Sequence, residues 1–215
     1  MKLKQFFLGL IALLATASVF AATTYTYTGP TYTTVSGAFT TSMRITGSFT
    51  TATPLVPNLA GVDITGQVTS YSFSDGVNTY TSSDANARIY QFTVATDANG
   101  MISWAGILLE VWENGTSPHV AGDNFSYMIT GEGDQAIDTL PCTVVGVSPY
   151  SAVADACIDA TESSGLGRAT VGALGSWTGG QIAATSIPTL SEWGMIILSS
   201  LLALGTILSL RRQHQ

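Results

Sequence analysis

Basic residues are scarce in this 215-residue chain, in which seven lysines and arginines stand against fourteen acids. Both lysines lie within the first four residues, and between residues 23 and 186 three arginines face thirteen carboxylates, a difference of −10. Nucleic-acid binding requires a surface of basic groups, so this composition argues against nucleic acid as a partner. An acidic exterior rich in threonine, serine and glycine fits a solvated exported protein, and acidity that merely maintains solubility is its simplest explanation.

Histidine is also scarce, and a nucleophile motif is missing. His119 is the only histidine between residues 23 and 186, and it ends the loop-like sequence Gly115–His119. The chain contains no Gly-x-Ser-x-Gly elbow that would present a nucleophile beside this histidine. We therefore expect His119 to be a surface-loop residue rather than a catalytic one, and the sequence predicts no hydrolytic site, no catalytic residue and no cofactor.

The acidic residues form no recognisable motif. Carboxylate pairs of the glycosidase kind could be drawn from Glu110 with Glu113 or from Glu132 with Asp134, but strand alternation is expected to turn Glu110 toward solvent. Asp123–Asn124 and the Glu132–Asp134 segment offer oxygen ligands for calcium, yet no Asp-x-Asp-x-Asp-Gly loop is present. We predict no metal site, and calcium binding stays an alternative.

The chain has two cysteines, Cys142 and Cys157, fifteen positions apart. This spacing excludes a Cys-x-x-Cys redox pair, and two distant thiols with His119 are too few ligands for zinc. An isolated pair in an exported domain predicts a disulfide bond. A loop of this size would stabilise the fold by about 3 kcal/mol in the chain-entropy model.

The N-terminal 22 residues have the layout of a secretory signal peptide. Two lysines precede an apolar core from Phe6 to Leu14, and small residues follow. Val19–Ala21 fits the small-x-small rule, which predicts cleavage after Ala21 or Ala22. An uncleaved anchor is the alternative, and the short apolar core argues against it. This interpretation makes the Sec translocon a partner.

Residues 23–178 are expected to form one β-rich domain. The clearest hairpin joins Arg88–Thr96 to Met101–Trp112 through the turn Asp97–Gly100, where asparagine and glycine tolerate positive φ. Many short strands with regular turn signals predict an antiparallel β-sandwich of jelly-roll-like type, or a related barrel. Further extended pieces are expected at Tyr25–Thr28, Tyr32–Thr41, Met43–Thr50 and Val68–Phe73, with a loop over Thr53–Ala60.

Two parts of the domain fit this strand pattern less well. Tyr150–Thr161, between the cysteines, could form a short helix with Val153, Ala156 and Cys157 on one face. The glycines that follow residue 164 indicate turns, and Gly179–Ser186 is expected to be a flexible linker. Trp104, Trp112 and Trp177, if exposed, would suit carbohydrate binding on such a domain.

The C-terminus contains an uncharged stretch, Met195–Leu210, that ends at Arg211 and Arg212. As a helix it would span about 24 Å, against about 30 Å for a bilayer's hydrocarbon core, so it is just long enough to cross. Trp193 precedes it, where an aromatic ring favours the membrane interface. The two arginines act as a stop-transfer signal and keep the C-terminus in the cytoplasm. On length and charge alone, an ordinary single-span anchor explains this segment.

A motif in front of this stretch points to a more specific role. Ile187, Pro188, Thr189 and Leu190 are followed by Trp193 and Gly194, the apolar stretch and the arginine pair. This arrangement resembles the IPTL-CTERM sorting signal, a relative of the PEP-CTERM signals handled by membrane-embedded, exosortase-type transpeptidases. The resemblance implies that Ile187–Leu190 is read outside the inner membrane, that the chain is cut nearby, and that the ectodomain is released or transferred. Pro188 biases Ile187 toward an extended conformation, which suits a peptide bound in a protease-type groove.

A second set of turn and strand motifs lies within the domain, at Ile45–Phe49, Pro57–Leu59, Ser70–Gly76 and Thr96–Gly100, with Ile102 and Trp104. These segments resemble the β-rich ectodomain common among PEP-CTERM-type secreted proteins, a family that supplies no catalytic residues. The sequence therefore predicts an exported, non-enzymatic cell-surface or extracellular-matrix protein, held transiently in the inner membrane. A secreted carbohydrate- or calcium-binding module with the same tail is the alternative.

Overall fold

The computed structural model describes residues 22–161, 163–180 and 194–203. The chain divides into two compact units, residues 1–181 and 182–215. The described part of the first unit is mainly strand, with one 3-10 helix, η1 (Thr65–Gln67). Its strands are β1 (Thr23–Thr28), β2 (Thr34–Ser36), β3 (Thr46–Thr51), β4 (Val62–Asp63), β5 (Val68–Ser74), β6 (Thr79–Thr81), β7 (Ala87–Thr96), β8 (Ile102–Trp112), β9 (Asn124–Ile129), β10 (Gln135–Gly146), β11 (Ala156–Ala160), β12 (Gly165–Arg168) and β13 (Ser176–Gly179).

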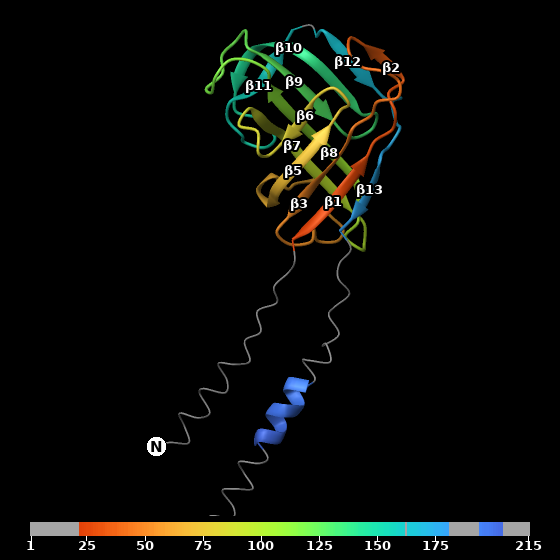
Figure 1. Ribbon diagram of the computed structural model, residues 1–215, viewed down its shortest axis with the longest axis vertical. Helices are drawn as coiled ribbons and strands as arrows, with labels where there is room; N and C mark the ends of the chain where they lie inside the picture. The colour runs from red at the N-terminus through yellow and green to blue at the C-terminus, as the bar shows by residue number, and fades with distance from the viewer. Residues whose placement is uncertain (1–21, 162, 181–193, 204–215) are drawn as a thin grey trace, which may run out of the picture. The chain divides into compact units, whose positions relative to one another are not determined.

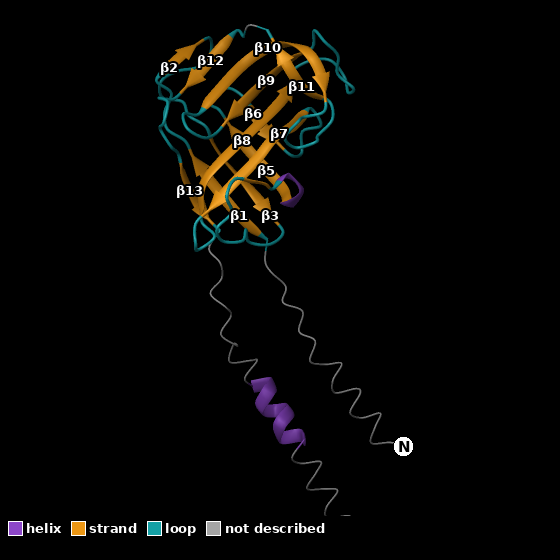
Figure 2. Cartoon of the chain, turned by 180° about the vertical axis from the view of Figure 1, so that it is seen from behind, coloured by secondary structure: helices purple, strands orange, loops and turns teal. Residues whose placement is uncertain are grey.

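These strands form two antiparallel sheets (Figures 1 and 2). The five-stranded sheet has the order β13-β1-β3-β5-β6, and the eight-stranded sheet has the order β2-β12-β10-β9-β8-β7-β4, with β11 also paired to β10. The predicted mainly β, antiparallel architecture is confirmed. The long strands β7 to β10 follow one another as a meander, instead of the interleaved Greek keys of a jelly roll, and neither sheet closes into a barrel.

The main core lies between the two sheets and follows from strand alternation. In β1, Tyr25 and Tyr27 are 0% and 2% exposed, while the threonines between and beside them face solvent. The rings of Phe49 on β3 and Phe92 on β7 meet edge to face, with centroids 4.8 Å apart. The inner faces of the two sheets therefore share one apolar core, and the outer face of each sheet lies outside this core.

The β7–β8 hairpin is confirmed at its predicted position. Asp97 Oδ1 accepts hydrogen bonds from the backbone N–H groups of Asn99 and Met101, and Gly100 has a φ of 77° that closes the turn. The pairing slips by one residue at Tyr90, which forms a β-bulge. The bulge lets Ile89 pack against the same core as Phe92 although the two are three residues apart.

The helix expected over Tyr150–Thr161 is wrong, because β11 occupies its second half and pairs with β10. Ala152 and Asp155 have φ values of 58° and 61°, which no right-handed helix permits. β11 lies over the outer face of the eight-stranded sheet. There a second apolar cluster gathers Trp112, Phe125, Ile137, Leu140, Cys142 and Cys157.

The glycine-rich end of the domain forms two strands, β12 and β13, and one of the expected turns lies between them at Gly172, which has a φ of 84°. A Cβ atom on Gly167 would lie 2.6 Å from the Tyr32 ring, so glycine here permits a close approach between strand and ring. The extended piece expected over Tyr32–Thr41 shrinks to β2, because Gly37 turns the chain at a φ of 64°. The loop over Thr53–Ala60 is confirmed. β13 ends at Gly179, the first residue of the predicted linker, and residues 181–186 lie outside the described residues.

The first and last strands of the described ectodomain lie next to each other. β1 and β13 are antiparallel neighbours, and Tyr25, near the start of β1, pairs with Gly179 at the end of β13 (Figure 1). The first strand after the predicted signal peptide and the last described strand before the tail are therefore side by side, with β13 at the edge of the five-stranded sheet.

In the second unit, residues 194–203 are helical. Ser199 Oγ donates to Met195 O at 2.6 Å and Ser200 Oγ donates to Ile196 O at 2.7 Å, so these hydroxyls are satisfied by the helix's own backbone. Within the described ranges, no helix has both the length and the apolar character needed to cross a membrane. The predicted signal peptide up to Ala21, the motif residues 187–193 and residues 204–215 lie outside the described residues.

Candidate functional site

Asp155 is the centre of a polar cluster beside the second apolar cluster. Its Oδ2 accepts a hydrogen bond from Arg88 Nη2 at 2.6 Å and lies 2.9 Å from His119 Nδ1, while its Oδ1 accepts from the His119 backbone N–H at 2.6 Å. Trp112 Nε1 donates to the backbone oxygen of Asp155 at 3.0 Å. Burial opposes the charge, but the hydrogen bonds from Arg88 and His119 outweigh it and hold the pKa of Asp155 well below its usual value.

His119 is 4% exposed, so the prediction of a surface-loop histidine is wrong. Its ring stacks on Trp112, with centroids 4.3 Å apart and planes 5° apart, and the Asp155 carboxylate fixes its orientation. Within the described ranges Nε2 is buried and has no hydrogen-bond partner. A carboxylate-oriented imidazole can act as a general base only if a hydroxyl or water reaches Nε2. Among the described residues, no serine or threonine hydroxyl does so.

Glu110 is 2% exposed, which overturns the expectation that alternation turns it toward solvent. Alternation does place it on the outer face of β8, but β11 covers that part of the face. Glu110 Oε2 accepts a hydrogen bond from the Cys157 backbone N–H at 3.0 Å. Burial raises the pKa of Glu110 to about 8, although this hydrogen bond and the nearby Arg88 favour the charged form.

The structure does not assemble the carboxylate pairs suggested by the sequence. Glu113 is exposed and accepts hydrogen bonds from Ser126 Oγ and Thr139 Oγ1, a different network from that of Glu110. Asp134 is buried, and its carboxylate lies 2.8 and 2.9 Å from Tyr27 OH and accepts a further hydrogen bond from the Gly131 backbone N–H at 3.2 Å, whereas Glu132 faces solvent. Burial raises the pKa of Asp134 to about 6. Each pair is thus split between one enclosed and one solvent-facing carboxyl group.

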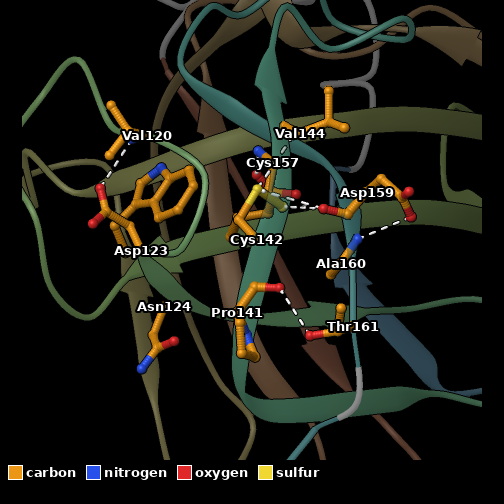
Figure 3. Close-up of a disulfide and its surroundings, with 12 residues drawn as sticks. Val120, Asp123, Asn124, Pro141, Cys142, Val144, Cys157, Asp159, Ala160 and Thr161 are labelled. Carbon is orange, nitrogen blue, oxygen red and sulfur yellow. Dashed lines mark hydrogen bonds between the residues drawn. A yellow bond between two sulfur atoms is a disulfide. The ribbon is translucent and has the colours of Figure 1, made fainter.

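The two cysteines lie where β10 and β11 run side by side (Figure 3). Their sulfur atoms are 2.12 Å apart, at bonding distance, and their Cα atoms are 5.8 Å apart. Cys142 is 1% exposed and Cys157 is 4% exposed. Just after β11, the backbone N–H of Thr161 donates a hydrogen bond to Pro141 O on β10 at 3.2 Å. In the loop before β9, the backbone N–H of Val120 donates to Asp123 Oδ2 at 3.0 Å.

The proposed calcium ligands do not converge. Over the ranges that the structure describes, no group of three or more histidine, cysteine, aspartate or glutamate side chains is placed to hold a metal ion. Asp123 Oδ2 is engaged by its own loop, and Asp134 is enclosed beneath Tyr27.

The three tryptophans have different surroundings. Trp112 is 2% exposed and stacked on His119, so it cannot present a ring to a sugar. Trp104 and Trp177 are half-buried and line one shallow pocket together with Tyr27 and Leu174.

The sequence analysis did not single out Arg88 and Asp155 as site residues. The two are 67 positions apart along the chain, and no local pattern relates them.

Comparison with known proteins identifies the tail. Residues 185–212 match the IPTL-CTERM motif, which confirms the resemblance found in the sequence. The match spans Ile187–Gly194, the apolar stretch and both arginines, and of these only residues 194–203 are described by the structure. Neither a curated protein nor a solved structure matches the chain.

Proposed function

We propose that this chain is an exported, non-enzymatic cell-surface or extracellular-matrix protein whose tail is processed by an exosortase-type transpeptidase. The observation that carries the proposal is the IPTL-CTERM match at residues 185–212. The chain enters the Sec translocon through its signal peptide, Met1–Ala22. Arg211 and Arg212 then stop transfer, which leaves Ile187–Leu190 on the outer side of the inner membrane.

The tail serves as a temporary anchor. Met195–Leu210 is near the lower length limit for a membrane span, so it holds the chain adequately rather than tightly. The glycine-containing segment that follows β13 gives a transpeptidase room to reach the motif without touching the folded domain. A permanent anchor would need no Ile-Pro-Thr-Leu motif in front of it.

A non-enzymatic role for the ectodomain agrees with its polar clusters. His119 Nε2 is enclosed, Glu110 lies beneath Cys157, and Asp134 lies beneath Tyr27. These groups make contacts between strands, and a substrate would have no open path to them. Of the alternatives, carbohydrate binding is favoured by Trp104, which remains accessible at the surface.

The test attaches one tag after Gln215 and a second tag within the exposed ectodomain loop at Gly122, where an added Cβ atom would have no neighbour within 4 Å. In the native host, mature protein should keep the ectodomain tag and lose the C-terminal one. Changing Pro188 and Thr189 to alanine should block this loss, whereas the control change of Gln181 and Ile182 to alanine, which lie before the matched residues 185–212, should not. If the doubly tagged chain persists in the membrane as the major mature form, the tail is an ordinary anchor and the proposal fails.

A further inference from the structure

The outer faces of the two sheets differ in chemistry. On the five-stranded sheet, side chains of Thr26, Ser48 and Ser72 stand side by side across β1, β3 and β5, and neighbouring rows are likewise built of serine and threonine. The eight-stranded sheet has a different row, in which paired positions run from Gln91 through Leu108, Ile129 and Gln135 to Arg168. Directly paired residues share a face, so this row forms a continuous strip across five strands.

This strip is open to solvent. Gln91, Leu108, Ile129 and Gln135 are half-buried and Arg168 is exposed, while Ile107 and Leu109 on the opposite face of β8 are 0% exposed. β11 covers the sheet at Glu110 and Trp112, farther along β8. We call the strip, together with Trp104, the amide–tryptophan face.

Gly106 leaves room on this face for the Trp104 ring. A Cβ atom on Gly106 would lie 2.7 Å from the Trp104 ring and 3.4 Å from Gln91 Nε2, so ring and carboxamide both lie over the same bare stretch of backbone. Gln91 Nε2 also donates to Thr93 Oγ1 at 3.2 Å. The result is an indole ring with an oriented amide beside it, which offers an apolar surface and hydrogen bonds within one small area.

The other end of the face carries a second ordered polar group. Arg168 donates to Gln135 Oε1 from Nε at 3.0 Å and from Nη2 at 2.5 Å, and Gln135 Nε2 donates to Tyr127 OH at 3.2 Å. These bonds fix the amide and the guanidinium, and the Tyr127 hydroxyl keeps its own proton to donate. Since neighbouring strands are about 4.8 Å apart, the three steps from β7 to β10 place the amides of Gln91 and Gln135 about 14 Å apart across the sheet.

The charge of the face restricts what can bind it. The domain carries a net −10, which repels nucleic acids and acidic polymers. The strip itself holds no carboxylate, and its one cation is bound to a neutral amide. The pocket between Trp104 and Trp177 encloses only about 10 Å³, room for one water molecule, so a ligand must lie across the open face. Flat apolar rings edged with hydroxyls, repeated along an extended chain, match this arrangement.

We propose that the amide–tryptophan face binds a neutral, linear, β-linked polysaccharide. A sugar ring packs on Trp104 beside Gln91, and later rings of the same chain reach Gln135 and Arg168. This activity belongs to the ectodomain and does not depend on removal of the tail.

The test uses isothermal titration of the full chain in a zwitterionic detergent without sugar groups. The probes are cellohexaose, xylohexaose and chitohexaose, with an alginate hexasaccharide as the acidic counterpart. At least one neutral probe should bind, and Trp104→Ala should weaken it about tenfold or more because the stacking surface is lost. Gln91→Glu, which keeps the side chain's shape, should weaken it about threefold or more, because the amide donor is lost. The matched change Gln67→Glu, on exposed η1, should leave the affinity unchanged.

Gln91→Glu keeps the test decisive if Trp104→Ala proves unstable, since an isosteric change on a half-buried position leaves the packing intact. The proposal is overturned if none of the neutral probes binds, or if alginate binds as tightly as the best of them. It is equally overturned if Gln91→Glu binds like the unchanged chain, or if Gln67→Glu weakens binding as much as Gln91→Glu does.

Discussion

Asp155 joins three segments that are distant in the sequence. It contacts Arg88 on β7 and His119 in the loop before β9, and its own φ of 61° turns the chain into β11. Its side chain is 12% exposed and that of Arg88 is 11% exposed, so this ion pair is screened less than a surface pair. Removing one member of an enclosed pair leaves the other without compensation.

Asp155→Asn should therefore lower the free energy of unfolding by about 2–3 kcal/mol. Asparagine tolerates a positive φ, so the change tests the charge and not the backbone. Urea unfolding followed by tryptophan fluorescence measures the loss. Asp159→Asn, at an exposed position on β11, is the control and should shift stability by no more than about 0.5 kcal/mol. Equal unfolding midpoints for the two variants would show that the cluster is dispensable.

Glu110 predicts a pH dependence of stability. Burial raises its pKa to about 8 from an ordinary 4.5, so the folded protein keeps a proton that the unfolded chain releases. The stabilisation is complete below pH 4.5 and is lost as the pH rises to about 8. Burial also raises the pKa of Asp134, to about 6, and that of Asp75, so the contribution of Glu110 is measured as the difference in slope between the wild type and a Glu110 variant from pH 6 to pH 8.

Glu110→Gln should flatten the fall of the urea midpoint between pH 6 and pH 8, because glutamine keeps an oxygen for the Cys157 N–H and has no proton to lose. Glu132→Gln, on an exposed loop, should leave the slope as it is. A wild-type midpoint that does not change over this interval would rule out the raised pKa.

At the scale of elements, β12 illustrates how glycine permits a strand to pack. Gly167 lies against the rings of Tyr32 and Phe39, and a Cβ atom there would be 2.6 and 2.9 Å from them. Gly167→Ala should cost about 1–3 kcal/mol by overpacking, measured by urea unfolding. Gly66→Ala is the matched control, because no atom lies within 4 Å of its added methyl group. Equal stability of the two variants would mean that the rings move aside without cost.

β11 depends on its link to β10. We predict that Cys142 and Cys157 are covalently bonded in protein taken from the native host, since their sulfur atoms lie 2.12 Å apart. Alkylation without reductant, followed by mass spectrometry, should label neither cysteine, and labelling after reduction should reach both. Replacing both cysteines with alanine should lower stability by about 3 kcal/mol. Two alkylated thiols in unreduced protein would refute the bond.

At the scale of the whole molecule, the ectodomain and the tail are separate units. The ectodomain has its own core, and the IPTL-CTERM match stays within residues 185–212. We therefore expect the tail to act independently of the domain in front of it. Fusing residues 179–215 to an unrelated exported protein should lead to loss of a C-terminal tag in the native host. The same fusion with Pro188 and Thr189 changed to alanine should keep the tag, and retention by both would show that the ectodomain takes part in sorting.

Features encoded by residues that are adjacent in the sequence could be predicted from it. The motif Ile187–Leu190, the apolar stretch and the arginines identify the tail because their order along the chain is the signal itself. The β7–β8 hairpin could be predicted because its turn, Asp97–Gly100, bonds to itself and its strands alternate on either side. Such features need only neighbours in sequence to form.

Only the tertiary structure decided which polar groups are enclosed. Alternation correctly assigned Glu110 to the outer face of β8, but the cover over that face comes from Cys157, 47 positions away. His119 was predicted to lie at the surface because the Asp155 carboxylate that binds its ring is 36 positions farther along the chain. Periodicity tells which face a side chain points to, whereas burial depends on what folds over that face, and contacts between distant segments leave no local pattern to detect.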